Sequence, residues 1–508
     1  MALACLIAAG VEGVDGYLVQ VEVNRAEAKT GPGRTTVVGL PDAAVRESID
    51  RVTPAVFASG LNHHPGNLLV INLAPADRRK EGPAFDLAIA LGLAATEPDN
   101  HLHLPNDTMF MAELGLDGAL RQVRGVLAGA IAARDAGLKR IVVAPGNAQE
   151  AAVVDGLTVH APVNVLECCT WLRAGLAAAP VVRPDPAAAP VGEIPELADV
   201  RGQEQAKRAL VIAAAGGHNL LMIGPPGSGK TMLARRLAGV LPEATLAEAL
   251  EVTRVHSVAG LLPSGVGLLR ARPFRAPHHN VSSVGLIGGG GIPRPGEVSL
   301  AHHGLLFLDE LPEFPRTVLE MLRQPLEDGH LTISRAGGRL TFPSRCMLVA
   351  AMNPCPCGYL GHPSRRCTDS ADAVHRYRSR ISGPLLDRID LHLEVPAQRP
   401  DLLAQPSGGE TTIQARARVT TARNLMLARQ GRPNATLGPK GLREHLNADA
   451  AGLALLNQAV EELGLSARAY DRILKVARTI ADLEARPAVT LDDISEAIGY
   501  RVLDRPNG

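Results

Sequence analysis

The chain has 508 residues, with 52 Lys and Arg against 52 Asp and Glu, so its formal net charge at pH 7 is zero. This length predicts roughly two to four domains and excludes a single small module. The charges balance and the sequence has no polybasic tail, so any nucleic-acid surface must be local. No stretch of about 18 consecutive apolar residues occurs, which argues against a membrane span.

Residues 1–178 alternate strand-like and helix-like runs, which predicts an α/β or α+β domain. Residues 1–10 are apolar but lack the basic segment of a secretory signal, so we expect them to belong to the fold. Seven cysteines in such a chain indicate thiols or a metal rather than a disulfide framework, and the expected location is cytoplasmic. The proline-rich stretch 179–195 is typical of a stiff linker between domains.

Three motifs in this first domain, at 38–42, 72–77 and 80–86, resemble the N-terminal domain of the YifB/ComM family, which is similar to the Lon protease catalytic domain. Lon uses a Ser–Lys dyad with the Ser directly after a Gly-Pro pair, because a neighbouring amine must take the hydroxyl proton. Here Gly82-Pro83 is followed by Ala84, and the helix-like run 127–135 contains no Lys, since Lys139 comes after its end. The resemblance therefore implies a non-proteolytic domain that serves subunit or DNA contact.

A glycine-rich turn lies between an apolar run, 220–223, and a helix-like stretch, 232–241, and predicts a phosphate-binding loop. In such a turn backbone N–H groups point at phosphate oxygens, Lys230 adds a positive charge and the Thr231 hydroxyl can bind Mg²⁺. The G-x-x-x-x-G-K-[ST] motif is matched by Gly224, Pro225, Pro226, Gly227, Ser228, Gly229, Lys230 and Thr231. The sequence thus predicts a site for ATP and Mg²⁺; the alternative is a chance glycine-rich loop.

Two acids, Asp309 and Glu310, follow the all-apolar run 305–308, which is typical of a strand buried in a parallel sheet. Ligands of open α/β sheets collect at the carboxyl ends of the strands, so both acids should face the nucleotide. We expect Asp309 to coordinate Mg²⁺ and Glu310 to polarise the attacking water. A solvated turn is the alternative.

A third apolar run, 347–351, leads to Met352 and Asn353, and Asn353 stands at the position of sensor 1 in AAA+ proteins, where a polar side chain orients the lytic water. An Asn-Pro turn with a structural amide is the alternative. Residues 382–391 resemble the segment that carries the arginine finger in the helix-2-insert AAA+ group, which assigns to Arg388 the stabilisation of γ-phosphoryl charge across a subunit interface. The alternative for Arg388 is a surface ion pair with Asp387 or Asp390.

The last part of the chain, 410–508, predicts an all-α lid, because apolar residues recur there at helical spacing. Ser466 can cap one helix, and Thr490 with Asp493 can cap the last. Arg468, in the first turn after Ser466, resembles sensor 2, which would reach the γ-phosphate when the lid closes. An ordinary exposed helix Arg is the alternative.

Four soft ligands follow Asn353 and predict a tetrahedral structural Zn²⁺ site, with unligated thiols as the alternative. They are Cys355, Cys357, His362 and Cys367. The family usually has a second C-x-C motif here, but Arg365 stands where its first Cys would be, so His362 would have to substitute. Another possible metal pair, His278 and His279, is better explained as hydrogen-bonded structure.

Two surface elements are candidates for DNA contact, because in the helix-2-insert AAA+ motors that this region resembles, the hairpin before sensor 1 points into the pore of a hexamer. Alternating, Thr-rich runs at 331–334 and 339–342 flank Gly337-Gly338 and predict a hairpin whose tip carries Arg335 and Arg339, with a plain solvated turn as the alternative. The run 288–291 of four Gly leads to Arg294 in the region of the helix-2 insert. Four consecutive Gly are costly to order, which favours movement or close approach to a partner over packing.

The resemblance to the YifB/ComM family covers nearly the whole chain and identifies the protein as a magnesium-chelatase-like AAA+ ATPase, with the ATPase core at 196–398. It implies an α/β fold, a homo-hexamer and a branched or single-stranded DNA substrate, since its better characterised members are hexameric branch-migration helicases of natural transformation. The spacing of the motifs predicts only the ATPase. The runner-up is a magnesium-chelatase motor that remodels a protein partner, and an ATP-dependent protease fails at Ala84 and the missing Lys.

Overall fold

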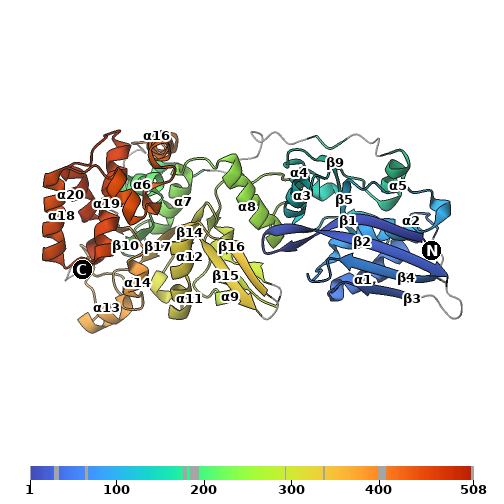
Figure 1. Cartoon of the computed structure of the whole chain (residues 1–508). Helices are drawn as coiled ribbons and strands as arrows, with labels where there is room; N and C mark the ends of the chain where they lie inside the picture. The colour runs from blue at the N-terminus through green and yellow to red at the C-terminus, as the bar shows by residue number, and fades with distance from the viewer. Residues whose placement is uncertain are drawn as a thin grey trace. The chain divides into compact units, whose positions relative to one another are not determined.

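The computed structural model describes residues 2–27, 34–62, 67–175, 180–182, 194–291, 293–335, 338–398 and 408–504. The chain divides into two compact units, whose elements are labelled in Figure 1. Unit 1 consists of Met1–Pro190, Ala249–Arg270 and Ser334–Thr341; unit 2 consists of Val191–Glu248, Ala271–Ile333 and Phe342–Gly508. Most of the predicted linker lies outside the described residues. No helix in the described ranges combines the length and the apolar character needed to cross a membrane.

Unit 1 is built on a mixed seven-stranded sheet in the order β3-β4-β2-β1-β5-β8-β9. Its strands are β1 (Ala2–Glu12), β2 (Asp15–Glu27), β3 (Arg34–Val38), β4 (Asn67–Ala74), β5 (Thr108–Met111), β8 (Arg140–Val143) and β9 (Thr158–His160). β2 pairs antiparallel with β1 and β4, and the other pairs are parallel. β1 confirms that the apolar N-terminal residues belong to the fold.

Helices cover both faces of this sheet. They are α1 (Ala43–Ala58), α2 (Asp86–Ala95), α3 (Val126–Asp135), α4 (Ala148–Ala152) and α5 (Val165–Arg173); β6 (Glu113–Leu114) and β7 (Leu120–Arg121) form a small hairpin. Along β1, Leu6 and Ala8 join the apolar cluster of α1, α2 and α5, whereas Ile7 and Ala9 join that of α3 and α4. This alternation follows from the two-residue period of a strand, and it makes unit 1 a three-layer α/β/α domain.

Unit 2 contains a five-stranded sheet in the order β11-β14-β17-β10-β18, with every pair parallel. The strands are β10 (Leu220–Ile223), β11 (Phe274–Arg275), β14 (Leu305–Leu308), β17 (Met347–Met352) and β18 (Leu391–Glu394). β10, β14 and β17 are buried along their whole length, as their apolar sequences predict. Ile223 lies opposite Met352, and Leu308 opposite Ala350, so the three strands end at one edge of the sheet.

The helices of unit 2 surround this sheet and form a helical C-terminal region, here called the lid. Those of the core are α6 (Glu204–Gly216), α7 (Lys230–Val240), α9 (Ser283–Ile287), α10 (Glu297–Leu300), α11 (Arg316–Met321), α12 (Arg323–Asp328), α13 (Ala371–Arg378) and α14 (Gly383–Leu386). Those of the lid are α16 (Thr412–Gln430), α17 (Pro439–His445), α18 (Ala450–Leu463), α19 (Ala467–Leu483) and α20 (Leu491–Gly499). A parallel-sheet α/β core with a helical C-terminal region is therefore confirmed.

The predicted caps of two lid helices are present. The Ser466 side chain accepts a hydrogen bond from the N–H of Ala469 at the start of α19. At the start of α20, Asp493 accepts from both the N–H and the hydroxyl of Thr490. Both caps satisfy groups that a helix N-terminus would otherwise leave unpaired.

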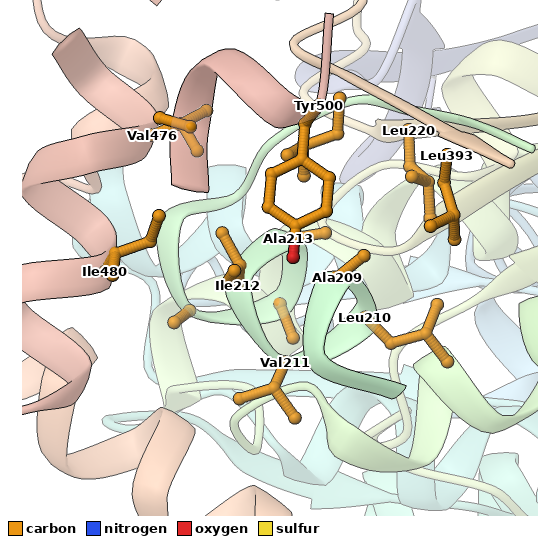
Figure 2. Close-up of a cluster of buried hydrophobic side chains, with 14 of the residues drawn as sticks. Ala209, Leu210, Val211, Ile212, Ala213, Leu220, Leu393, Val476, Ile480 and Tyr500 are labelled. Atoms are coloured by element: carbon orange, nitrogen blue, oxygen red, sulfur yellow. The ribbon is translucent and has the colours of Figure 1, made fainter. Parts of the chain in front are cut away.

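Helix α6 joins the lid to the sheet through one apolar core. Ten of its thirteen residues are buried, as expected for a helix that is covered on every side. Figure 2 shows Val476 and Ile480 of α19 on one side of α6, and Leu220 of β10 with Leu393 of β18 on the other. The sheet and the lid therefore pack against the same helix, α6.

Three further elements complete the chain. α8 (Leu246–Ala259) contributes residues to both units. β15 (His330–Arg335) pairs with β16 (Gly338–Pro343) in the predicted hairpin, whose residues also fall in both units. β12 (Gly288–Gly289) and β13 (Arg294–Pro295) form a short antiparallel ribbon.

Candidate functional site

The phosphate loop connects β10 to α7, as the sequence predicts. Gly227 and Gly229 have φ values of +76° and +92°, a region that favours glycine. A Cβ on Gly224 would lie 2.1 Å from the carbonyl oxygen of Val395, so only glycine fits there. The loop conformation thus explains why glycine stands at these positions.

Lys230 is held across the loop by oxygen atoms. Its Nζ donates hydrogen bonds to the carbonyls of Gly224 (2.7 Å) and Pro225 (3.0 Å) and to Oδ1 of Asn353 (3.3 Å). The residue is only 9% exposed. Burial lowers the pKa of Lys230, whereas the nearby charges of Asp309 and Glu310 raise it. The structure therefore brings together the predicted phosphate lysine and the predicted sensor 1 amide.

Thr231 and Asp309 meet where Mg²⁺ coordination was predicted. The Thr231 hydroxyl donates to Oδ2 of Asp309 over 2.7 Å. The other oxygen, Oδ1, accepts from the N–H of Glu310 over 3.0 Å. A hydroxyl and a carboxylate in contact form the oxygen donor set that Mg²⁺ takes in phosphate-binding sites. The donor set thus fits the Mg²⁺ that accompanies ATP.

Glu310 is the second residue after β14 and has a left-handed backbone conformation with φ +53°. This conformation costs a non-glycine residue roughly 1–2 kcal/mol and is concentrated at functional sites. The side chain is 55% exposed, and Oε2 lies 3.4 Å from Nδ1 of His279. We read the His278-His279 pair as structural from sequence, but His279 contacts the predicted hydrolytic acid. No sequence motif relates His279 to Glu310; they meet because β11 and β14 are neighbouring strands.

Arg388 is enclosed by protein groups. The residue is 9% exposed. Its guanidinium pairs with Glu327 and donates to the carbonyls of Arg323 (3.1 Å) and Pro384 (2.7 Å). Arg388 thus pairs with Glu327, in place of the ion pair with Asp387 or Asp390 that the sequence suggested. The finger role stays a prediction, and it requires that these contacts be exchanged.

Arg468 lies on the surface at the start of α19. Its side chain is 60% exposed, and Nη1 is 3.9 Å from Oδ2 of Asp387. Exposure leaves the guanidinium free to change its partner, because a surface ion pair contributes little free energy. Its partner Asp387 is the residue before Arg388, so Arg468 contacts the segment that carries the predicted arginine finger. The sensor 2 role stays a prediction.

A buried ion pair that sequence reasoning missed joins the core to the lid. Asp390 is 3% exposed and pairs with Arg472 of α19. Its carboxylate also contacts Nδ1 of His218 (3.2 Å) and accepts from the N–H of Asn219 (3.1 Å). Burial raises the pKa of Asp390, but Arg472 and His218 hold it well below its usual range. The partners are far apart in the chain, and no local pattern relates them.

Three of the four predicted zinc ligands come together. The Sγ atoms of Cys355, Cys357 and Cys367 are separated by 3.4, 3.5 and 3.6 Å. The carboxylate of Asp369 is the fourth member of this cluster. His362 is not in it; its Nδ1 accepts hydrogen bonds from its own loop. The sequence therefore predicted the thiols but not the carboxylate.

The candidate DNA contacts are partly described. Arg339 and Arg294 are exposed, whereas residues 336–337 and the side chain of Arg335 lie outside the described parts. Gly288 has φ +102°, and a Cβ on it would lie 2.5 Å from the carbonyl oxygen of Arg294. For Gly288, close packing of the ribbon β12/β13 on itself therefore accounts for the glycine, in contrast to our expectation.

Three family models match the chain. "Subunit ChlI of Mg-chelatase" matches residues 21–147, "Magnesium chelatase, subunit ChlI" matches 196–403, and "Magnesium chelatase, subunit ChlI C-terminal" matches 409–501. The magnesium-chelatase 38 kDa subunit of Rhodobacter capsulatus is 28% identical over 171 residues, which are 30% of this chain and 48% of that subunit.

Longer similarities extend over both units. Competence protein ComM of Haemophilus influenzae is 44% identical over 514 residues, covering 99% of this chain and 98% of that protein. The uncharacterized protein YifB of Escherichia coli is 41% identical over 507 residues, with the same shares covered. The family implies ATPase activity with ATP and Mg²⁺, which agrees with the phosphate loop and the Thr231–Asp309 pair. The chain therefore belongs to the YifB/ComM family of magnesium-chelatase-like AAA+ ATPases.

Proposed function

We propose that the protein is a hexameric ATP-driven motor that moves branched DNA, as a branch-migration helicase in recombination or natural transformation in the cytoplasm. The observation that carries the ATPase part is the contact of Thr231 with Asp309 beside the Lys230–Asn353 hydrogen bond. The DNA part is supported by the similarity, over nearly the full length, to a relative named a competence protein. ATP turnover and DNA movement are therefore separate claims, tested separately.

In this proposal the residues of one chain bind ATP and prepare its hydrolysis. The N–H groups of the loop and the Lys230 ammonium bind the phosphates, and Thr231 with Asp309 holds Mg²⁺, which neutralises charge on them. Glu310 orients and polarises the attacking water at the end of β14. Asn353, already hydrogen-bonded to Lys230, keeps a polar amide beside the same phosphates.

The hexamer follows in the proposal from the role given to Arg388. An arginine finger acts on a nucleotide of the neighbouring subunit, so the catalytic site is complete only in a ring. Within its own chain the Arg388 guanidinium pairs with the half-exposed Glu327. Water can hydrate the Glu327 carboxylate when the pair opens, so the exchange of partner costs little free energy.

DNA contact is assigned to local arginines because the chain has no net charge. Arg335 and Arg339 on the β15/β16 hairpin, with Arg294 on the β12/β13 ribbon, are the candidates, and a ring would gather six copies of each. Each phosphate neutralised on duplex DNA adds about 0.9 to the slope of log affinity against log salt. A hairpin in the ring pore therefore predicts a steep salt dependence.

The test uses the full-length protein with a four-way DNA junction and a linear duplex of the same composition. We expect the junction to stimulate ATP turnover and to be migrated. The double substitution Arg335→Ala and Arg339→Ala should flatten the salt slope and abolish migration while basal turnover persists. Arg443→Ala, an exposed arginine of α17, is the matched control and should leave both unchanged. A rate of ATP turnover that neither the junction nor the duplex changes would refute the proposed action on DNA.

For the N-terminal part, residues 1–178, we propose a Lon-protease-like domain without proteolytic activity. Ala84 follows Gly82-Pro83 in a short 3₁₀ turn, and it is buried and lacks a nucleophile. The core at 196–398 and the lid at 410–508 complete the proposed domains, joined by the linker 179–195. A casein-degradation assay with ATP is expected to show no cleavage.

The second candidate is a motor that remodels a protein partner of magnesium chelation. It is favoured by the 28% identity to the magnesium-chelatase 38 kDa subunit, although this covers only 30% of the chain. The same ATPase assay separates the candidates. Stimulation by chelatase partner subunits without any effect of DNA would favour the second one.

A further inference from the structure

The three thiols after Asn353 have the spacing of metal ligands. Their Sγ atoms form a nearly equilateral triangle with sides of 3.4, 3.5 and 3.6 Å. A disulfide needs about 2.05 Å between its sulfurs, so none of these pairs is bonded. Zn–S bonds of about 2.3 Å in a tetrahedron place two sulfurs roughly 3.8 Å apart. A shift of a few tenths of an ångström would therefore convert the triangle into one face of a zinc site.

Asp369 stands at the fourth corner. Its carboxylate lies within 4.8 Å of all three Sγ atoms, and Oδ2 is 3.8 Å from Sγ of Cys367. Oδ2 also accepts a hydrogen bond from the N–H of Cys357 over 2.8 Å. Carboxylates that bind metals are commonly oriented by a hydrogen bond of this kind. The side chain is therefore fixed facing the thiols from within their own loop.

His362, the alternative fourth ligand, is turned to other partners. Its Nδ1 accepts from the N–H groups of Ser364 (3.2 Å) and Arg365 (3.1 Å). Its ring packs edge-on against Tyr359, with the centroids 5.6 Å apart. Both contacts would have to break before Nδ1 could reach the thiols.

We propose that the thiolates of the three cysteines and the carboxylate of Asp369 bind one Zn²⁺ in a closed structural site. Soft sulfur ligands select zinc over Mg²⁺, and four protein ligands leave no open position for catalysis. Each thiol must lose its proton on binding, so metal uptake releases protons to the solvent. This inference does not depend on the DNA substrate.

The proposed site would support the phosphate loop. The same loop begins at Asn353, which accepts from Lys230. At Gly358 it approaches the phosphate loop so closely that a Cβ would lie 2.6 Å from Cδ of Pro226. A metal that fixes the cysteine loop therefore fixes one wall of the nucleotide site.

The first measurement uses the wild-type protein. Full-length protein purified without added metal and passed over a chelating resin is analysed for zinc by mass spectrometry. We expect about one Zn²⁺ per chain, because a closed structural site retains its metal. A mercurial thiol reagent, which also reacts with the exposed Cys5, should release that zinc as the three ligand thiols react. A preparation that contains no zinc, and takes up none from a zinc buffer, would overturn the proposal.

The second measurement identifies the fourth ligand by competition of zinc with a chromophoric chelator. Asp369→Ala should weaken zinc binding at least about tenfold, since loss of an indirect metal partner alone costs 10–100-fold. His362→Ala is the matched control and should bind zinc like the wild type. Asp369→Cys, which offers a fourth thiolate, should restore affinity and so exclude a mere folding defect.

The opposite pattern would refute the ligand set. If His362→Ala lost zinc while Asp369→Ala kept it with wild-type affinity, His362 would be the fourth ligand. Bound Co²⁺ provides a check that needs no variant, because its visible spectrum reports tetrahedral geometry and thiolate ligation. An octahedral spectrum without thiolate bands would also count against the site.

Discussion

The buried ion pair between lid and core predicts that Arg472→Met destabilises unit 2 by about 3–4 kcal/mol at pH 7. Removing one partner of a buried pair typically costs 3–5 kcal/mol, because the other charge stays buried. Asp390 is 3% exposed and would keep only His218 and the N–H of Asn219 as partners. The carboxyl can also escape by binding a proton. Protonating at pH 7 a carboxyl whose unfolded-state pKa is near 3.9 costs about 4 kcal/mol, so the loss of stability cannot exceed about this value.

The same reasoning fixes the sign of the pH dependence. In the wild type the folded-state pKa of Asp390 lies below its unfolded value, so its contribution is present above about pH 4 and is lost as the pH falls through the folded pKa. In Arg472→Met the folded pKa lies above the unfolded value. Once the pH falls below this folded pKa, the deficit of the variant should therefore shrink by roughly 1.4 kcal/mol per pH unit, to about 1.5 kcal/mol at pH 5.

Urea unfolding followed by far-UV circular dichroism measures this deficit. Trp171, the single tryptophan, lies in α5 of unit 1, so its fluorescence serves as an internal reference that should not change. Arg468→Met is the matched control from the same helix; its side chain is 60% exposed and should cost within about 0.5 kcal/mol. Equal stability of Arg472→Met and wild type at pH 7, or a deficit that grows on acidification, would refute the reasoning.

The remaining predictions concern the nucleotide site. Lys230→Ala should weaken ATP binding in calorimetry, whereas Glu310→Gln should keep ATP bound and lower turnover at least about hundredfold; normal turnover in Glu310→Gln contradicts its role. Mixing Lys230→Ala with Arg388→Ala subunits should restore part of the turnover, and a lack of recovery at every ratio, with assembly confirmed by light scattering, argues against a finger in trans. Gly358→Ala should weaken ATP binding more than Gly361→Ala, because both have positive φ but only the first has phosphate-loop atoms in reach of a Cβ. Equal effects of the two substitutions on ATP binding would show that the approach of Gly358 to Pro226 does not support the nucleotide site.

The nucleotide site could be predicted because its parts are local. Each of its strands is a short apolar run, and the functional residue follows the last residue of that run, as Asp309 follows Leu308. The carboxyl ends of parallel strands meet at one edge, so three separate motifs predict one site. The structure adds the contacts within it, such as the 2.7 Å bond from Thr231 to Asp309.

The contacts that sequence reasoning missed are those between distant segments. Asp390 and Arg472 are 82 residues apart and meet only because α19 packs beside α6 and the end of the sheet. His279 reaches Glu310 because β11 and β14 are neighbours, although no motif joins them. Asp369 was overlooked for another reason, since carboxylates are common in loops and its spacing matches no frequent zinc motif.

The loop after β17 connects two of these features. Asn353 at its start contacts Lys230, and Gly358 within it lies against Pro226, so the loop reaches the phosphate loop at two points. Between these points stand Cys355 and Cys357, which the proposed zinc would tie to a later turn of the same loop. Bound phosphates would attract the Lys230 ammonium, and zinc would hold in place the loop that carries its partner Asn353. Zinc removal should therefore weaken ATP binding without any zinc ligand touching ATP. A wild-type protein that binds ATP equally well with and without its zinc would separate the two sites.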